Sequence, residues 1–300
     1  MQLIDGKATS EIIKDEIRDA VNLLLSEGKR APHLVAILVG NDGASETYVS
    51  NKIKTCKAVG FVSTLLRFDP SISEMQLLQE IDRLNNDDTI DGFIVQLPLP
   101  AHINVPKVTE AILPEKDVDG FHPINIGRMT QQMPCYLPAT PKGIMQLLER
   151  YNIETAGKNC VVIGRSNIVG TPMSVLLSRN TNPGNCTVTL CHSQTKDIAS
   201  ITKQADIIIA AIGRPEFVKA DMVKDGAVVI DVGMTRISSA ETKTGYRLVG
   251  DVDFENVASK CSFITPVPGG VGPMTIIGLL QNTLLAAQKV IYNNAVGISN

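Results

Sequence analysis

Short apolar runs alternate with longer amphipathic segments through the first hundred residues. Three of the runs are typical of buried strands: "HLVAILVG" (33–40), "STLLRFD" (63–69) and "DGFIVQLPLP" (91–100). Apolar side chains at helical spacing indicate helices over residues 8–27, 45–59 and 73–86. Strands that are apolar almost throughout, with helices between them, predict a parallel sheet covered on both faces.

A second series of the same kind follows an interruption. Residues 114–143 are rich in proline, glycine and polar side chains, which indicates a linker and loops. After a helix at "GIMQLLERYN", four apolar runs indicate strands over residues 159–164, 186–193, 205–213 and 226–233. An apolar helix over residues 276–291 ends the pattern, and we expect it to cross back to the first series.

The pattern predicts an α/β protein with two domains. We place residues 1–140 and 273–300 in an N-terminal α/β domain, and residues 141–272 in a Rossmann-like, doubly wound domain. A chain of 300 residues is long enough for two domains, each with its own core.

Composition and charge exclude several classes of protein. The net charge is −3 and there is no long basic run, so we expect no nucleic-acid partner and no membrane surface. No apolar stretch is long enough to span a bilayer, and the N-terminus lacks the features of a signal peptide, so we expect a cytoplasmic protein. The six cysteines form no C-x-x-C pair, and the four histidines show no ligand spacing. We therefore expect reduced cysteines and no metal.

The turn "GRSNIVG" opens the second series and indicates a dinucleotide site. Gly164 and Gly170 bracket it, but Ser166 stands where the middle glycine of G-x-G-x-x-G would be. The turn follows a strand and starts a helix, whose N-terminus can bind a phosphate. The alternative is a plain strand–turn–helix connection.

The next strand favours NADP over NAD. NAD sites usually place Asp or Glu at its end, whereas this strand ends in "TLCHSQT" with no carboxylate. Arg165, Ser166, His192 and Ser193 could instead surround a 2′-phosphate. The alternative is that Arg165 is a solvated loop residue.

Several polar residues gather at the ends of the first series. Tyr48 and Lys52 share one face of a predicted helix, and Gln96 follows a strand. Asp117 and Asp119 lie in "EKDVDG", and "TPVPGGVGPMT" combines stiff prolines with closely approachable backbone. Each has a plainer alternative: a solvated Tyr/Lys pair, an amide bonded to a loop, and a turn aspartate.

These motifs together resemble one family. "YVSNK", "VQLPLP", "EKDVDG", "GRSNIVGTPM", "CHSQT" and "TPVPGGVGPMT", in this order, are similar to bifunctional methylenetetrahydrofolate dehydrogenase/methenyltetrahydrofolate cyclohydrolases. The resemblance runs from about residue 3 to 290. It implies that the N-terminal domain is catalytic, that tetrahydrofolate derivatives bind in a cleft between the domains, that NADP is the cofactor, and that the chain forms a homodimer.

The resemblance also implies roles for individual residues. Tyr48 would pack against the folate, Lys52 would be the catalytic lysine, Gln96 would position it, and Asp119 would hold the pterin. The implied substrate positions are Tyr48, Lys52, Val95, Gln96, Leu97, Asp119, Pro268, Gly269, Gly270, Val271 and Gly272. The implied cofactor positions are Gly164, Arg165, Ser166, Ser193 and Met234. One departure is Ala139, where some members have cysteine.

The two reactions make different demands. Hydride loss from the methylene carbon needs no acid or base, only correct placement against the nicotinamide. Hydrolysis of the methenyl product needs a general base, for which Lys52 is the candidate if its amine is partly neutral. Two rival interpretations stay open: another NADP dehydrogenase with a catalytic His or Arg, and a non-catalytic relative that binds without turnover.

Overall fold

A computed structural model describes residues 1–239, 242 and 245–292. The chain forms two compact units, which we name by their sheets. Of the described residues, the three-strand unit contains 12–139 and 276–292, and the six-strand unit contains those of 1–11 and 140–275. The end of the predicted segment 273–300, residues 293–300, lies outside the described residues.

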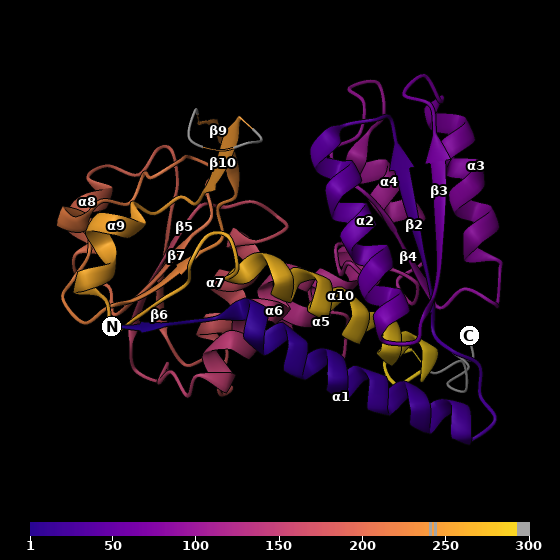
Figure 1. Ribbon diagram of the computed structural model, residues 1–300, viewed down its shortest axis with the longest axis horizontal. Helices are drawn as coiled ribbons and strands as arrows, with labels where there is room; N and C mark the ends of the chain where they lie inside the picture. Colours follow the sequence, from indigo (N-terminus) through magenta and orange to yellow (C-terminus); the bar gives the residue numbers. More distant parts are fainter. Residues whose placement is uncertain (240–241, 243–244, 293–300) are drawn as a thin grey trace. The chain divides into compact units, whose positions relative to one another are not determined.

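The three-strand unit is built on a parallel sheet with the order β3-β2-β4. Its strands are β2 (His33–Val39), β3 (Val62–Phe68) and β4 (Gly92–Val95), and its first helices are α1 (Gly6–Ser26), α2 (Gly43–Ala58), α3 (Glu74–Asn85) and α4 (Val105–Ala111). Figure 1 shows α3 running alongside β3. The strands and long helices expected for this part of the chain are present. A core that includes Ile37, Leu77, Ile81 and Phe93 is fully buried beneath them.

Local sequence determines where α2 and α3 begin. The Asp42 carboxylate accepts a hydrogen bond from Ser45 N at 2.8 Å, which caps α2. Ser73 and Gln76 form a reciprocal capping box at the start of α3. These caps fix the first turns of both helices, and α2 carries Tyr48 and Lys52.

The prediction of a linker over residues 114–143 was wrong in part. The structure places α5 (Pro123–Thr130) inside it and begins α6 at Ala139 (Ala139–Arg150). Pro123 lies in the first turn, where proline is tolerated, and the His122 ring accepts a hydrogen bond from Ile124 N. The prolines and glycines of this segment therefore suggested loops, although they are compatible with the helices that the segment contains.

The last helix belongs mostly to the three-strand unit. It spans α10 (Val271–Ala287) and so begins five residues before the predicted start. The buried Asn282 donates hydrogen bonds to Val118 O at 2.9 Å and to Leu137 O at 2.8 Å. These bonds hold the second half of α10 against residues of the first series.

The six-strand unit contains one parallel sheet with the order β1-β11-β8-β7-β5-β6. Its strands are β1 (Gln2–Leu3), β5 (Asn159–Ile163), β6 (Thr187–Cys191), β7 (Ile207–Ala210), β8 (Val228–Asp231) and β11 (Phe263–Ile264). Its remaining elements are α7 (Gly170–Ser178), α8 (Ile198–Thr202), η1 (Ala220–Met222), α9 (Phe254–Val257) and η2 (Ala258–Lys260). β6 and β7 lie on opposite sides of β5, so the strand order reverses there, which is where doubly wound sheets bind ligands.

Two parts of this unit differ from the sequence expectation. Residues 1–11, which we had placed in the N-terminal domain, belong here because β1 pairs with β11. An antiparallel hairpin of β9 (Thr235–Ser238) and β10 (Tyr246–Val249) follows β8 and was not predicted.

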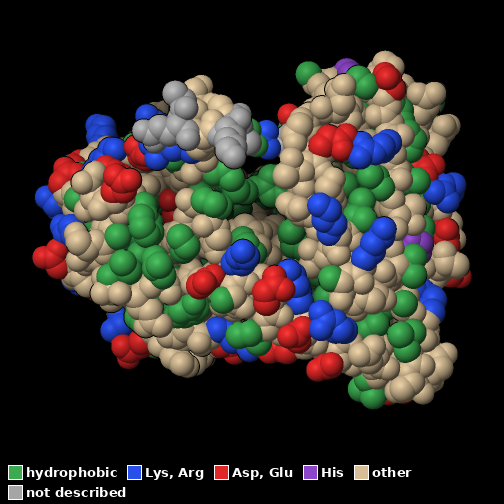
Figure 2. Space-filling view, in the orientation of Figure 1, with side chains coloured by type: hydrophobic (Ala, Val, Ile, Leu, Met, Phe, Trp, Pro, Cys, Tyr) green, Lys and Arg blue, Asp and Glu red, His purple; other side chains and the backbone are tan. Residues whose placement is uncertain are grey.

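The surface carries no single dominant charge on the face drawn in Figure 2, where Lys and Arg side chains are interspersed with Asp and Glu. Among the described residues, no helix is both long and apolar enough to cross a membrane. All six cysteines are buried and free, as predicted.

Candidate functional site

A buried lysine is the centre of the site in the three-strand unit. Lys52 lies in the middle of α2 with only 8% of its side chain exposed. Its Nζ donates a hydrogen bond of 3.1 Å to Gln96 Oε1. Lysine is rarely buried to this extent without a partner, so this burial contradicts the alternative of a solvated Tyr/Lys pair. Tyr48, one turn earlier on α2, is half-buried.

Gln96 is held at both ends of its amide. It follows β4 directly, accepts from Lys52 through Oε1, and donates from Nε2 to Leu97 O at 2.6 Å. Because each end has a different partner, the amide has one orientation, with its oxygen toward the lysine. The structure therefore brings together the two residues that the sequence analysis had paired.

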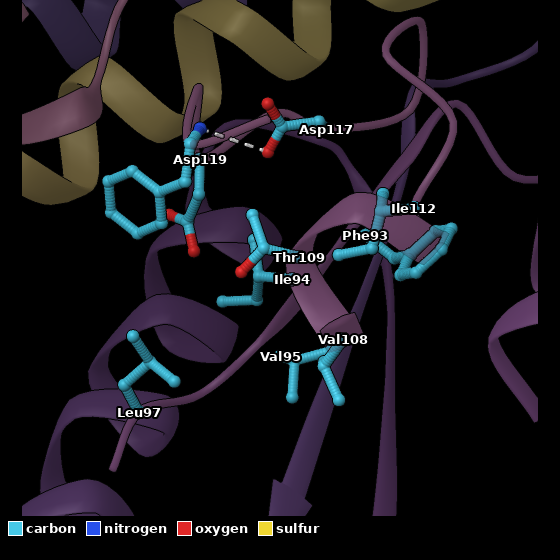
Figure 3. Close-up of a pocket in the computed structure, with 10 residues that line it drawn as sticks. Phe93, Ile94, Val95, Leu97, Val108, Thr109, Ile112, Asp117 and Asp119 are labelled. Atoms are coloured by element: carbon cyan, nitrogen blue, oxygen red, sulfur yellow. Dashed lines mark hydrogen bonds between the residues drawn. The ribbon is translucent and has the colours of Figure 1, made fainter. Parts of the chain in front are cut away.

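A small cavity in the three-strand unit lies against Val95 and Leu97, the two neighbours of Gln96 in the chain (Figure 3). Its volume is about 20 Å³, which is enough for roughly one water. The lining side chains are Phe93, Ile94, Val95, Leu97, Val108, Thr109, Ile112, Asp117, Asp119 and Phe121. Val95 and Leu97, two predicted substrate positions, are therefore at the cavity with Asp119.

Asp117 and Asp119 share the loop but differ in their contacts. Asp117 is buried and accepts hydrogen bonds from Phe121 N, His122 N and Asn125 Nδ2 at 3.2, 2.8 and 2.9 Å. Burial raises the pKa of Asp117 to about 7. Its acceptor capacity is used to hold the loop and the start of α5, so it has a structural role.

The Asp119 carboxylate is available for a ligand. It is half-buried, and among the described residues no donor forms a hydrogen bond to it. Desolvation raises the pKa of Asp119, and the nearby charge of Lys52 opposes that rise. The Lys52 charge therefore acts on this carboxylate, and both residues lie in the three-strand unit.

The predicted cofactor turn in the six-strand unit is shaped by glycines. Gly164 has φ +115°, and a Cβ there would lie 2.1 Å from Ala211 O. A Cβ at Gly170 would lie 2.0 Å from Gly164 O, so neither position tolerates a side chain. Ser166 Oγ accepts a hydrogen bond of 3.2 Å from Val169 N, which places its hydroxyl at the start of α7.

The side chains around this turn are exposed. Arg165, Ser166 and Ser193 lie on the surface, and Met234, after β8, is 38% exposed. His192 is engaged within its own turn, where Nδ1 accepts a hydrogen bond from Gln194 N. The exposed arginine and serines could contact a phosphate.

The segment from Pro268 to Gly272 follows β11 and includes the first two residues of α10, and it belongs to the six-strand unit. Gly269 has φ +105°, and its carbonyl accepts a hydrogen bond of 2.9 Å from Lys7 N. A Cβ at Gly270 would lie 2.6 Å from Pro266 O. Pro268 is exposed, and Val271 and Gly272 open α10. The predicted substrate positions therefore come from both units.

Comparison with known proteins identifies the family. The tetrahydrofolate dehydrogenase/cyclohydrolase catalytic domain matches residues 4–119, and the NAD(P)-binding domain of the same family matches residues 138–291. This chain belongs to the tetrahydrofolate dehydrogenase/cyclohydrolase family. Its two matched domains confirm the predicted fold class and the predicted family.

Relatives of the family extend over nearly the whole chain. The bifunctional protein FolD of Bacteroides thetaiotaomicron is 60% identical over 292 residues, which cover 97% of this chain and 100% of that protein. The crystal structure of the bifunctional enzyme FolD from Campylobacter jejuni, 47% identical, has a TM-score of 0.91 and covers 97% of this chain and 99% of that one.

A third relative is described with its cofactor. The Trypanosoma brucei dehydrogenase-cyclohydrolase, complexed with NADP and an inhibitor, is 38% identical. The match has a TM-score of 0.91 and covers 97% of this chain and 98% of that one. Membership of the family argues against the alternative of another NADP dehydrogenase with a catalytic His or Arg.

The sequence analysis missed two buried residues of the NAD(P)-binding domain. Asp231 ends β8 and is 3% exposed, and Asp251 follows β10 and is fully buried. The available signal was the repeated pairing of aspartate with glycine in "IDVG" and "GDVD", where a charged residue interrupts apolar sequence.

Proposed function

We propose that this chain oxidises 5,10-methylenetetrahydrofolate to the methenyl form with NADP and then hydrolyses that product to 10-formyltetrahydrofolate. The observation that carries the proposal is the buried Lys52 and its hydrogen bond to Gln96, and the same unit holds the Asp119 carboxylate, whose pKa the lysine's charge lowers against the effect of burial. An intact pair of this kind argues against a relative that only binds its ligands.

The dehydrogenase step depends on placement. The methylene carbon lies between two nitrogens, N5 and N10, and loses a hydride to the nicotinamide, which leaves a cation shared by both nitrogens. No proton moves, so the residues of the site need only hold the carbon near the cofactor and exclude water. The half-buried Tyr48 ring would pack against the folate and provide part of that placement.

The cyclohydrolase step depends on proton transfer. A water adds to the methenyl cation and loses a proton, which leaves a neutral hydroxyl adduct. The bond from that carbon to N5 then breaks as N5 takes up a proton and the hydroxyl loses its own to form the formyl C=O, so one proton in all is released. Lys52 would accept the proton through Nζ and return it, and Gln96 would hold the amine in position. The low exposure of Lys52 removes the competing water that would otherwise disorder its amine.

Asp119 would recognise the pterin. A carboxylate accepts hydrogen bonds from a ring N–H and an exocyclic amine at once, which suits the donor edge of a pterin. Val95 and Leu97 line the same one-water cavity as Asp119, so their apolar side chains would lie next to a ring that the carboxylate binds. We propose that Pro268–Gly272, from the NAD(P)-binding domain, contributes further folate contacts.

The NAD(P)-binding domain would select NADP. Gly164 and Gly170 leave room for the diphosphate near the start of α7, and Ser166, Ser193 and Met234 would line the cofactor. Arg165 is exposed and would pair with the 2′-phosphate, a group that NAD lacks. The trypanosome relative, whose structure contains NADP, supports this preference. We also propose a cytoplasmic homodimer, as the family resemblance implies.

One assay tests the proposed function. Purified protein is mixed with methylenetetrahydrofolate and NADP, and NADPH formation is followed at 340 nm. Decay of methenyltetrahydrofolate absorbance is then followed separately, without cofactor. We expect both signals. NADP reduction only with a non-folate substrate would favour another dehydrogenase, and folate binding without either signal would favour a non-catalytic relative.

A further inference from the structure

Two buried aspartates lie together at the carboxyl edge of the six-stranded sheet. Asp231 is the last residue of β8, and Asp251 follows β10. Both contact Gly233: its N–H donates to Asp231 Oδ1 at 2.9 Å, and a Cβ there would lie 2.4 Å from Asp251 Oδ1. The carboxylates are therefore neighbours in an interior where charges are rarely buried.

The pair connects two loops of the sheet. Asp251 Oδ2 accepts hydrogen bonds from Ile212 N at 2.7 Å and Gly213 N at 2.9 Å, just after β7. Asp231 Oδ1 accepts from Asp251 N at 2.8 Å as well as from Gly233 N, just after β8. The hydrogen bonds thus run from one loop through both aspartates to the other.

The glycines beside the pair leave space for it. A Cβ at Gly250 would lie only 1.8 Å from Asp231 Oδ2, so that carboxylate occupies the place of a side chain. Burial raises the pKa of Asp231 to about 7, and the neighbouring charge of Asp251 contributes in the same direction. Burying two carboxyl groups costs desolvation free energy, which indicates that they have a role beyond packing.

We propose that Asp251, acting with Asp231, is a positioning residue for the cofactor, because it fixes the backbone of Ile212–Gly213 relative to Gly233–Met234. This inference rests on the proposed function, in which Met234, in the loop after β8, lines the cofactor. Ligands of doubly wound sheets bind at this carboxyl edge. Both aspartates are buried in the interior, so each would act through the backbone it holds.

The two carboxylates differ in a way that makes the inference testable. All hydrogen bonds to the Asp251 carboxylate go to Oδ2, and among the described residues no donor reaches its buried Oδ1. An asparagine at 251 could therefore keep both bonds and place its NH₂ where Oδ1 was. Asp231 uses both oxygens, because Oδ2 accepts from Val252 N at 2.9 Å. An asparagine at 231 would point its NH₂ donor at a backbone N–H, which is also a donor, so a hydrogen bond would be lost.

The experiment compares Asp251→Ala, Asp251→Asn and Asp231→Asn, with Asp225→Asn as a control because Asp225 is highly exposed. The KM for NADP and the kcat of the dehydrogenase are measured for each, together with thermal unfolding. We expect Asp251→Ala to raise the NADP KM about tenfold or more, because two buried N–H groups lose their acceptor, with a smaller change in kcat. Asp251→Asn should restore the KM to within about threefold of the parent, and Asp231→Asn should not.

The outcomes separate this inference from the proposed function. An unchanged NADP KM in Asp251→Ala, or a loss in Asp251→Asn as large as in Asp251→Ala, would overturn the positioning role while the parent activity still stood. A lower melting temperature without a change in KM would also overturn it. If Asp251→Ala does not fold, equal NADP KM values in Asp251→Asn and Asp231→Asn would count against the inference. A parent chain without NADP-dependent oxidation would overturn both the inference and the proposed function.

Discussion

The two units prepare their candidate sites in opposite ways. In the three-strand unit, Lys52 and Gln96 are already bonded to each other and the lysine is buried. In the six-strand unit, Arg165 and Ser193 are exposed, and the backbone around the glycines largely determines the shape of the candidate cofactor site. Proton transfer needs a group held in one position before the substrate arrives, whereas a charged cofactor can order exposed side chains as it binds.

The two units also share one feature. Each unit holds one aspartate whose pKa burial raises to about 7, Asp117 in the first and Asp231 in the second. Each accepts three hydrogen bonds that fix a loop next to the candidate site. Both sites therefore rest on rigid loops, and the units differ in the side chains that the ligand meets.

The largest expected effect follows from removing the lysine. Lys52→Met keeps the length of the side chain and removes the base, so cyclohydrolase activity should fall by about 10²–10⁴-fold. The exposed Lys54 on the same helix provides the matched control, and Lys54→Met should leave the rate near the parent value. A cyclohydrolase rate for Lys52→Met equal to that of Lys54→Met would show that the buried lysine is not the base.

The next effect concerns the folate-binding carboxylate. Asp119→Ala should raise the dissociation constant for the folate by roughly tenfold to a hundredfold, because a pterin edge would lose a charged acceptor worth about 1.5–3 kcal/mol. NADP affinity should change little, which makes it the control for folding. Titration of the variant with both ligands checks this, and unchanged folate affinity would make Asp119 a turn residue only.

A smaller effect is expected for the cofactor arginine. Arg165→Ala removes a charge-assisted contact to the 2′-phosphate, so the NADP dissociation constant should rise by about tenfold while that for NAD hardly changes. Both constants can be measured on one preparation by fluorescence or calorimetry. Equal losses for the two cofactors would mean that Arg165 does not distinguish them.

The last prediction, with the smallest expected effect on catalysis, concerns how the free energy of unfolding depends on pH. The pKa of Asp117 is raised in the folded chain, so between the unfolded value near 4 and about 7 the folded state binds more protons than the unfolded state. This contribution to the free energy of unfolding is therefore greatest at acid pH. It falls as the pH rises to about 7 and is flat above it, and the two pKa values limit its total change to roughly 4 kcal/mol.

Urea unfolding of the parent and of Asp117→Asn over pH 4.5–8 checks that contribution. The variant should be less stable at every pH, because the amide cannot accept on both sides, and its stability should depend less on pH. The lowered pKa of His122 gives a contribution to stability that rises with pH, opposite to that of Asp117. The difference in the free energy of unfolding between the two proteins is therefore the quantity to compare. The same pH slope in both would show that Asp117 does not cause it.

Much of the fold could be predicted because its signals are long. The strands β2, β5, β7 and β8 are nearly continuous apolar runs, and α1 and α3 repeat apolar residues at helical spacing. β1 and β11 have two residues each, so no periodic pattern could reveal them, and their pairing moves residues 1–11 into the second unit. Pairing between such distant segments is a tertiary event that a local pattern does not record.

The candidate site was predicted less evenly. Helical spacing put Tyr48 and Lys52 on one face, and the structure adds the bond to Gln96 that spacing could not supply. The residues Asp231 and Asp251 escaped notice because each lies within or beside apolar sequence, where a lone carboxylate gives no sign of the backbone donors that hold it. Those donors come from loops up to 39 residues away in the chain.

The central claim is that proton transfer depends on the three-strand unit and cofactor selection on the six-strand unit. Its most direct test is a crossed measurement of both activities in Lys52→Met and Arg165→Ala, with dehydrogenase rates taken at subsaturating NADP. We expect Lys52→Met to lose cyclohydrolase activity far more than dehydrogenase activity, and Arg165→Ala to lose dehydrogenase activity while its cofactor-free cyclohydrolase activity stays near the parent value. If Lys52→Met retains cyclohydrolase activity but loses dehydrogenase activity, or if Arg165→Ala loses both equally, the division is wrong.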